Sequence, residues 1–298
     1  MHHLQSIQKA LDWIEAHLTE ELGLDTIART AGMSHWHFQR TFSAMVGESV
    51  GGYIRRRRLT EAARSLRSNH STILEIALNF QFESHEAFTR AFKSELQITP
   101  SAWRSNLDAN VNLQPRIHVN AHSLEQRYRH MKLTPEIITL PGRTYIGMEA
   151  HFISATSPKA NNMEVIPKLW DQFTRRISEI DSPESEAVYG LSDCLSGQKA
   201  SRPDEAIYLA SVLARDGAVA PQGMKSWKSP QGSFAKFIHR GRVEKIGETR
   251  DYIYAKWLPE SDFERAAGPD IERCDSRFNP TSDDSVMEMF IPVQTKRD

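Results

Sequence analysis

The feature that most constrains this chain is a nine-residue phrase that occurs twice, fifty residues apart. Residues 34–42 read SHWHFQRTF and residues 84–92 read SHEAFTRAF, and both fit the pattern Ser-His-x-x-Phe-x-Arg-x-Phe. Phenylalanines four residues apart lie on one face of a helix, and a serine before them is a favourable N-terminal cap. The phrase therefore predicts two similar short helices, each held to a small core by its phenylalanines.

The repeat extends beyond the phrase. Ile27 and Ala28 recur as Ile76 and Ala77 at an offset of 49, whereas the phrase itself has an offset of 50, so one residue is inserted between them. The repeating unit is then a short helix, a tight turn and a longer helix, which is the helix-turn-helix plan. Helices are predicted at 35–46 and 85–96, with a long helix at 50–67 between them.

Side chains on the outer faces of these helices suit the edges of DNA bases, because arginine pairs with guanine and glutamine with adenine. The candidates for contact are Trp36, Gln39, Arg40 and Ser43 in the first helix, and Glu86, Thr89, Arg90 and Lys93 in the second. The helix start at Ser34 could bind a phosphate. Four consecutive arginines, Arg55, Arg56, Arg57 and Arg58, point in all directions around the helix, so some face the core and others solvent or phosphate.

The connecting helix at 50–67 is about 27 Å long at 1.5 Å per residue. Successive major grooves on one side of a duplex are about 34 Å apart. A single chain could therefore place its two helices in adjacent grooves without a dimer or a palindromic site. The alternative from the pattern alone is a helical bundle that binds protein.

Charge, cysteine usage and hydropathy limit which partners and which cellular compartment are expected. The net charge is -1, divided as +3 over residues 1–133 and -4 over 134–298, which favours an anionic partner weakly for the first part. Cys194 and Cys274 are far apart in the sequence and predict no disulfide framework. The N-terminus lacks the apolar core of a signal peptide, and no apolar run has the roughly 20 residues of a membrane helix. We therefore expect a cytoplasmic protein with no membrane partner.

Beyond residue 134 the pattern changes to mixed α and β. Strands are predicted at 135–140, 144–152, 187–192, 205–214, 233–239 and 286–293, and helices at 163–180 and 243–258. Two strands, a helix and more strands thus occur twice, which indicates an internal duplication. The sequence predicts an all-α domain at 1–106, a polar linker at 107–133 and an α+β domain at 134–298.

One carboxylate interrupts the apolar strand expected at 286–293. Alternation places Glu288 on the same face as Val286 and Phe290. Because an unpaired buried carboxylate is costly, Glu288 either pairs with a lysine or arginine, reaches solvent, or receives a cationic ligand. Among the aromatic residues, Tyr208 is favoured for a pocket with such an acid because its same-face neighbours are alanines, and Phe290 shares the face of Glu288.

Four segments of the first hundred residues, SHWHFQRTF, GESVGGYIRRRRLTEAA, ILEIALNFQFESHEAFTRAFK and TPSAWR, resemble the DNA-binding domain of AraC/XylS-family regulators of the MarA, SoxS and Rob type. The resemblance implies base contacts to an asymmetric promoter site, RNA polymerase as a partner, and a role in multidrug or stress response. The base-reading positions it implies are Trp36, Gln39 and Arg40, then His85, Glu86, Ala87, Thr89 and Arg90. The first three letters of the second set differ from the Gln-Gln-Thr of that subgroup, so the downstream half-site should differ.

The segments VYGL, DEAIYLASVLA, QGSFAKFIHRGRVEKIGETRDYIYAKWLPES and MEMFIPV resemble the GyrI-like effector-binding domain. That resemblance implies two related sheet-plus-helix halves around a pocket for a small hydrophobic or cationic ligand, with Glu288 as the ligand-binding glutamate. Trp170 and Tyr189 are pocket candidates only through this resemblance. Together the two resemblances imply a transcription regulator rather than an enzyme, without cofactor or metal. Two alternatives stay open: a ligand-independent DNA-binding protein whose second domain recruits partners, and a small-molecule hydrolase.

Overall fold

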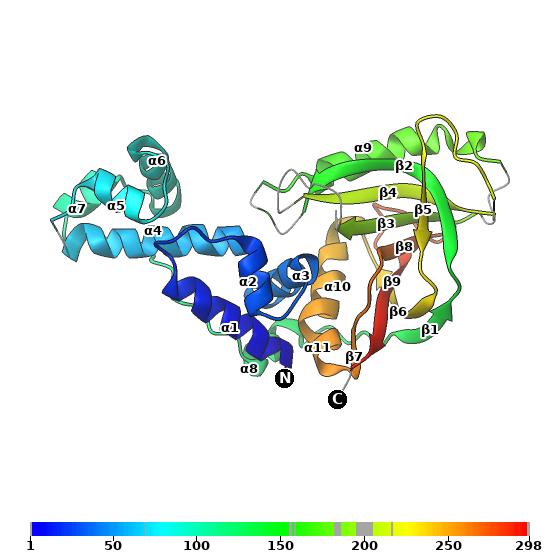
Figure 1. The fold of residues 1–298 in the computed structure, drawn as a ribbon, viewed down its shortest axis with the longest axis horizontal. Helices are drawn as coiled ribbons and strands as arrows, with labels where there is room; N and C mark the ends of the chain where they lie inside the picture. Colours follow the sequence, from blue (N-terminus) through cyan, green and yellow to red (C-terminus); the bar gives the residue numbers. More distant parts are fainter. Residues whose placement is uncertain are drawn as a thin grey trace. The chain divides into compact units, whose positions relative to one another are not determined.

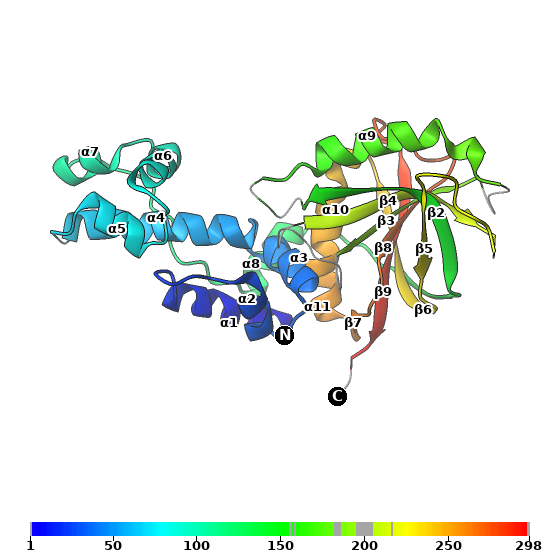
Figure 2. The same cartoon turned by 45° about the horizontal axis from the view of Figure 1, so that its top comes forward.

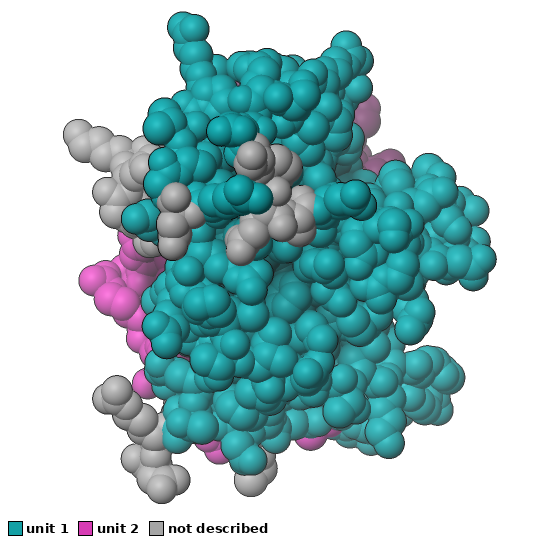
Figure 3. Space-filling model, turned by 90° about the vertical axis from the view of Figure 1, so that its right-hand side faces the viewer, with its two compact units in different colours: residues 1, 122–298 teal, residues 2–121 magenta. Residues whose placement is uncertain are grey.

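The chain forms two compact units. The computed structural model describes residues 2–68, 70–154, 157, 159–181, 186–194, 205–215 and 217–296. Residues 2–121 make up one unit, called here the helical unit, and residues 122–298 make up the other, called the sheet unit; Figure 3 colours them separately. The boundary falls inside the segment that the sequence predicts as a linker.

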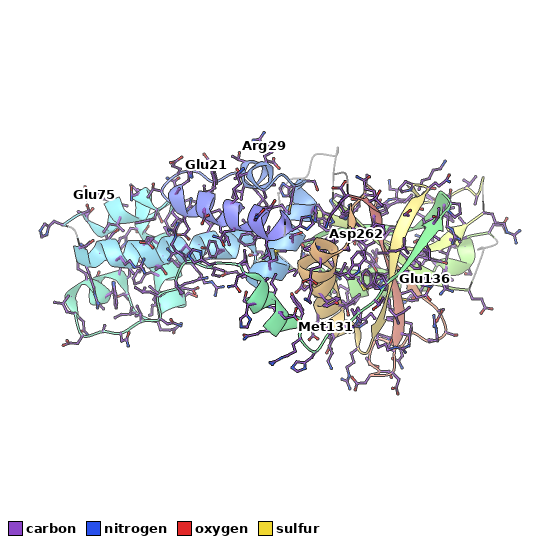
Figure 4. The ribbon with its side chains drawn as sticks, turned by 90° about the horizontal axis from the view of Figure 1, so that it is seen from below. Glu21, Arg29, Glu75, Met131, Glu136 and Asp262 are labelled. Carbon is purple, nitrogen blue, oxygen red and sulfur yellow. The ribbon has the colours of Figure 1, made fainter. Side chains whose placement is uncertain are left out.

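The described residues of the helical unit form seven helices (Figure 1). They are α1 (His2–Ala16), α2 (Leu24–Thr30), α3 (His35–Val46), α4 (Val50–Ser68), α5 (Ile73–Asn79), α6 (His85–Leu96) and α7 (Pro100–Ser105). The predicted bounds 35–46 and 85–96 match α3 and α6, because each helix has a serine cap before it and a residue of left-handed conformation after it. Arg29 and Glu75, labelled in Figure 4, mark the equivalent helices α2 and α5 of the two repeats.

The two helix-turn-helix turns have the same backbone geometry. Gly32 has φ 68° in the first turn, and Gln81 has φ 63° at the equivalent place in the second. The N–H of Gly32 donates to a carbonyl three residues back at 2.9 Å, and the N–H of Gln81 does the same at 3.0 Å. A non-glycine residue rarely adopts this conformation. Gln81 is further held by its side-chain amide, which donates to the carbonyl of Thr19 at 2.7 Å.

Each longer helix is capped and anchored as the repeated phrase predicts. The hydroxyl of Ser34 accepts the N–H of His37 at 3.4 Å, and that of Ser84 accepts the N–H of Ala87 at 3.1 Å. The phenylalanine pairs are fully buried, with ring centroids 5.5 Å apart in α3 and 5.4 Å apart in α6. Capping and core packing therefore explain why serine and phenylalanine occur at the same places in both copies.

The first part of the expected linker is bound to the helical unit. The N–H of Gln114 donates to the hydroxyl of Thr60 at 3.1 Å, and Arg67 donates to the carbonyl of Ala109 at 3.1 Å. The N–H of Val119 donates to the Gln8 side chain at 3.0 Å. The second part forms a helix that the sequence pattern did not predict, α8 (Ala121–Tyr128).

In the part of the sheet unit that the structure describes, nine strands form one antiparallel sheet. The strands are β1 (Glu136–Leu140), β2 (Arg143–Ile153), β3 (Val188–Cys194), β4 (Glu205–Ala214), β5 (Lys225–Ser229), β6 (Gly232–Arg240), β7 (Phe263–Arg265), β8 (Asp270–Cys274) and β9 (Val286–Thr295). Its main helices are α9 (Asn162–Thr174), α10 (Ile246–Tyr252) and α11 (Leu258–Glu260), with a π-helical segment at Ile253–Trp257 between the last two. The predicted helix at 163–180 ends early, at Thr174, and β5, β7 and β8 were not predicted.

The strand order confirms the two related halves. The sheet runs β1-β6-β9-β8-β3-β4-β2-β5, with β7 paired to β9. The first half contains β1, β2, α9, β3 and β4, and the second contains β5, β6, α10, β7, β8 and β9. The first strand of each half pairs with the second strand of the other: β1 with β6, and β5 with β2. The pairs β1–β6 and β2–β5 lie at opposite ends of the strand order. Short connections from β1 to β2 and from β5 to β6 join these two ends, so the sheet curls toward a closed form (Figure 2).

The register fixes which side chains share a face of the sheet. Glu288 pairs with Arg273, Arg273 with Tyr189, and Tyr189 with Ser211, which gives one row across four strands. Directly paired residues point to the same face, so this row belongs to one face, called here the open face. The opposite face, called the helix face, meets α9 and α10.

Two further features concern the whole described chain. None of the helices described is both long and apolar enough to cross a membrane. Cys274 is a free thiol, and burial raises its pKa, whereas the side chain of Cys194 lies outside the described part of the chain.

Candidate DNA-binding surface and ligand pocket

Helix α6 presents an exposed polar face beside its buried phenylalanines. His85, Glu86, Arg90 and Lys93 are exposed, and Ala87 and Thr89 are half-buried. The hydroxyl oxygen of Thr89 is buried and has no hydrogen-bond partner among the described residues. The predicted side chains of the second helix are therefore available to a ligand that lies along α6.

Glu86 is ready to accept hydrogen bonds at neutral pH. A hydrogen bond from its own backbone N–H, together with one from the Ser84 hydroxyl, holds the pKa of Glu86 below its usual value. An ionised carboxylate accepts from the amino group of cytosine. The Glu86 side chain is thus an exposed, ionised acceptor on α6.

The corresponding side chains of α3 are not open in the structure. Trp36, Gln39 and Arg40 are 4%, 5% and 6% exposed, and Ser43 is half-buried. The guanidinium carbon of Arg40 lies 4.3 Å from the centroid of the Trp36 ring, which lays the arginine along the helix. The indole N–H of Trp36 is buried without a hydrogen-bond partner among the described residues. Most of the outer side chains of α3 are thus buried, whereas most of those of α6 are exposed.

The four arginines of α4 have four different environments. Arg55 is exposed, Arg56 donates to Glu48 at 3.0 Å, and Arg58 donates to the carbonyl of Leu18 at 2.8 Å. Arg57 is only 1% exposed. Some of the four arginines were predicted to face the core, and Arg57 is the one that does, so it is not available as the DNA contact considered for the run.

Arg57 is the centre of a buried polar network. Its guanidinium reaches Glu15 at 2.7 Å, Glu61 at 2.6 Å and the carbonyl of Gln114 at 2.7 Å. The hydroxyl of Tyr53 also donates to Glu15, at 2.7 Å. These contacts join α1, α4 and the segment after α7, so the network stabilises the frame that carries α3 and α6.

The open face of the sheet contains a cavity of about 200 Å³. Three of the predicted ligand residues, Glu288, Tyr189 and Phe290, line it. The other lining residues are Ile138, Leu140, Arg143, Tyr145, Lys236, Ile271 and Arg273. The structure therefore brings the predicted glutamate and two of the four predicted aromatic residues into one pocket.

Glu288 is paired within the protein. Its Oε2 lies 2.8 Å from Nη1 of Arg273, and its Oε1 lies 3.2 Å from Nη2 of Arg277. Asp275 also pairs with Arg277, whose hydrogen bonds hold the pKa of Asp275 well below its usual range. Of the three possibilities left open by the sequence, pairing with arginine is the one observed.

Trp170 and Tyr208 lie on the helix face, away from this pocket. The hydroxyl of Tyr208 donates to Glu272 at 2.9 Å, and the indole of Trp170 in α9 donates to that hydroxyl at 3.3 Å. A Cβ on Gly190 would come within 1.9 Å of the Tyr208 hydroxyl, so this glycine makes room for the ring. The prediction that Trp170 and Tyr208 line a pocket with Glu288 is wrong, since strand register places Tyr208 on the opposite face and Trp170 contacts it there from α9.

Seven lining residues of the pocket were not predicted from the sequence, and four of them carry polar groups: Arg143, Tyr145, Lys236 and Arg273. Tyr145 occurs in a predicted strand, and its burial follows from alternation. Arg143 and Lys236 are polar residues that reach the cavity from β2 and β6. Arg273 belongs to β8, a strand of five residues with three charged side chains, DIERC, and no apolar alternation marked it.

No group of three or more histidine, cysteine or acidic residues in the described parts of the chain could hold a metal ion.

The comparisons with known proteins divide the chain as the structure does. Residues 27–106 match the helix-turn-helix domain family, and residues 133–294 match the family described as the GyrI-like small molecule binding domain.

Curated relatives match the whole chain and its first part. The right origin-binding protein of Escherichia coli is 28% identical over 97% of this chain and 98% of its own length. The transcriptional activator AarP of Providencia stuartii is 43% identical over 37% of this chain and 84% of its own. The regulatory protein SoxS of Salmonella typhimurium is 38% identical over 36% of this chain and its entire length. The chain therefore belongs to the AraC-type DNA-binding transcription regulators, in the branch that carries a C-terminal GyrI-like small-molecule-binding domain.

Proposed function

We propose that the protein reads two different half-sites in successive major grooves of one DNA duplex, with α3 and α6. The observation that carries this proposal is the repeated turn geometry, in which Gly32 and Gln81 hold the same left-handed conformation before two capped helices. Two equal frames with unequal outer side chains suit an asymmetric site. The resemblance to known regulators also supports RNA polymerase as a partner at such a site.

The length of α4 is consistent with this spacing. The helix has 19 residues and is therefore about 28 Å long. Grooves that face the same side of the duplex are about 34 Å apart, so two helices near the ends of α4 can reach both. In α6, Arg90 and Glu86 would read bases, and Lys93 would contact phosphate.

The pocket on the open face would give the protein control by a small apolar ligand. It is lined by aliphatic and aromatic side chains with a few charged groups, which is the usual composition of a small-molecule site. A ligand bound there changes DNA affinity only if the two units are energetically coupled. Glu288, the residue that the hydrolytic alternative would use as an acid or base, is held by two arginines.

Arg90→Ala should weaken binding to the preferred DNA site by about 1–3 kcal/mol, because a base contact is lost. The preferred site is first selected from random duplexes, and affinity is then titrated at fixed salt. Lys93→Ala, one turn further along α6, is the matched variant. A phosphate contact carries no sequence information, so Lys93→Ala should weaken all sequences about equally and lower the salt dependence.

The result that would refute the reading role of α6 is equal affinity of Arg90→Ala and the wild type for the preferred site. A loss of the same size on unrelated duplexes would reassign Arg90 to phosphate contact.

A further inference from the structure

The charged groups of the open-face pocket are mostly cationic. Arg143, Lys236 and Arg273 line the cavity together with one carboxylate, Glu288. These four carry two net positive charges at neutral pH. When the neighbouring ion-pair partners Arg277, Asp275 and Glu136 are included, the sum is still one positive charge.

The one acid of the pocket is already neutralised. Both carboxylate oxygens of Glu288 have an arginine partner, one at 2.8 Å and the other at 3.2 Å. Arginine and carboxylate form strong charge-assisted hydrogen bonds. A ligand cation would have to displace Arg273 or Arg277 from Glu288 and leave the two arginines to share a single carboxylate, Asp275, so the site is poorly suited to a cation.

Two cationic side chains of the pocket, Arg143 and Lys236, have no partner or only a weak one among the described residues. Arg143 is half-buried and has no ion-pair or side-chain hydrogen-bond partner among the described residues. Lys236 pairs only with Glu136, whose side chain on the edge strand β1 is 62% exposed; Figure 4 labels Glu136. An exposed acid is well hydrated and contributes little to an ion pair.

Apolar surface lies beside these cations. Ile138 and Leu140 of β1, and Phe290 of β9, line the same cavity as Arg143. The cavity volume of about 200 Å³ is below the roughly 300–1,000 Å³ of typical ligand pockets, so it accommodates a small molecule.

We propose that this pocket binds a small amphipathic anion, an aromatic or aliphatic carboxylate whose charged end pairs with Arg143 and whose apolar end packs on Leu140 and Phe290. The inference rests on the proposed role of the pocket as a ligand site and specifies the charge of the ligand. Pairing satisfies a guanidinium that the fold leaves without a partner, and it spares the ligand the cost of an unpaired buried carboxylate.

The test uses three molecules with the same phenylpropyl body and different charge: 3-phenylpropionate, 3-phenylpropylamine and 3-phenylpropanol. Their affinities for the full chain are measured by calorimetry near pH 7.5, where the acid is ionised and the amine protonated. The carboxylate should bind most tightly. Arg143→Gln should weaken it about 10- to 100-fold, because a hydrogen bond between two charged groups is lost, and should not weaken the alcohol.

Arg175→Gln is the matched control, since Arg175 is an exposed arginine directly after α9 that pairs with Asp171 and does not line the pocket. It should leave all three affinities unchanged. Glu288→Gln should leave carboxylate binding unchanged or strengthen it, because Arg273 and Arg277 are released.

The outcomes separate two failures. If the amine binds most tightly and Glu288→Gln abolishes its binding, the pocket is a ligand site for cations, and only the inferred charge is wrong. If the three molecules bind equally, or if Arg143→Gln has no effect on the carboxylate, the inferred charge is also wrong. If none of the three binds at millimolar concentration, the proposed ligand site fails as well.

Discussion

Arg57→Met should lower the free energy of unfolding of the helical unit by about 3–5 kcal/mol, the usual cost of removing one partner from a buried ion pair. The variant leaves Glu15 buried with only Tyr53 and the half-exposed Arg116 as partners, and it leaves the carbonyl of Gln114 without its donor. Hydrogen exchange of the α1 and α4 amides in the full chain measures the loss.

The loss should depend on pH in a defined direction. In the folded wild type, burial raises the pKa of Glu15, but hydrogen bonds from Arg57 and Tyr53 outweigh it, and the pKa lies below the usual 4.5. A carboxyl with a lowered folded pKa stabilises the fold fully above its unfolded pKa, and that stabilisation disappears as the pH falls through the folded value. The difference between wild type and Arg57→Met should therefore be larger at pH 7 than at pH 4.

Two further variants separate the ion pair from simple loss of charge. Arg64→Met removes an exposed arginine from the same helix, and the loss should be within about 1 kcal/mol. The double variant Arg57→Met, Glu15→Leu removes both buried charges and should recover most of the stability. A single variant as stable as wild type, or a double variant less stable than the single one, would show that the network does not stabilise the frame.

Phe92→Ala should cost about 3–5 kcal/mol of stability, since it leaves a cavity in a fully buried cluster. The cluster joins α4, α5, α6 and α7, and Phe92 contacts Phe88 within it. Loss of hydrogen-exchange protection should be concentrated in α5, α6 and α7. Phe42→Ala is the matched variant in the first copy of the repeat, and its loss should be concentrated in α2 and α3.

The control for the second copy is Leu78→Ala, a truncation of a half-exposed side chain on α5, which should cost far less. If Phe42→Ala and Phe92→Ala each lowered protection evenly over the whole helical unit, the two repeats would share one cooperative core. The separate anchoring of α3 and α6 would then be wrong.

Much of the helical unit could be predicted, because the signals for it are local. Cap, helix period and turn are each encoded within a few residues, so α3 and α6 follow from the repeated phrase alone. The role of Arg57 was also encoded, since it lies four residues after the buried Tyr53 and three after the buried Ile54, on the same face of α4. Because Arg57 is one of four consecutive arginines, its helical spacing from Tyr53 and Ile54 was not recognised in the sequence.

The pocket could be predicted only in part, because its composition depends on pairing between distant strands. Alternation within β9 is enough to place Glu288 beside Phe290. Whether Tyr208 faces them depends on the register through β3 and β8, and β8 has no apolar pattern. The two arginines that pair with Glu288 come from β8 and the segment after it, so sequence reasoning had no basis for seeing that the carboxylate is already partnered.

The central claim is that one chain reads two unlike half-sites in adjacent grooves, and guanine methylation interference on the selected DNA site tests it most directly. Two patches of interference should appear about one helical turn, or 10 base pairs, apart, with different sequences and no twofold relation. Arg90→Ala should erase one patch and Arg40→Ala the other. A single patch, or two patches that form a palindrome, would contradict the claim.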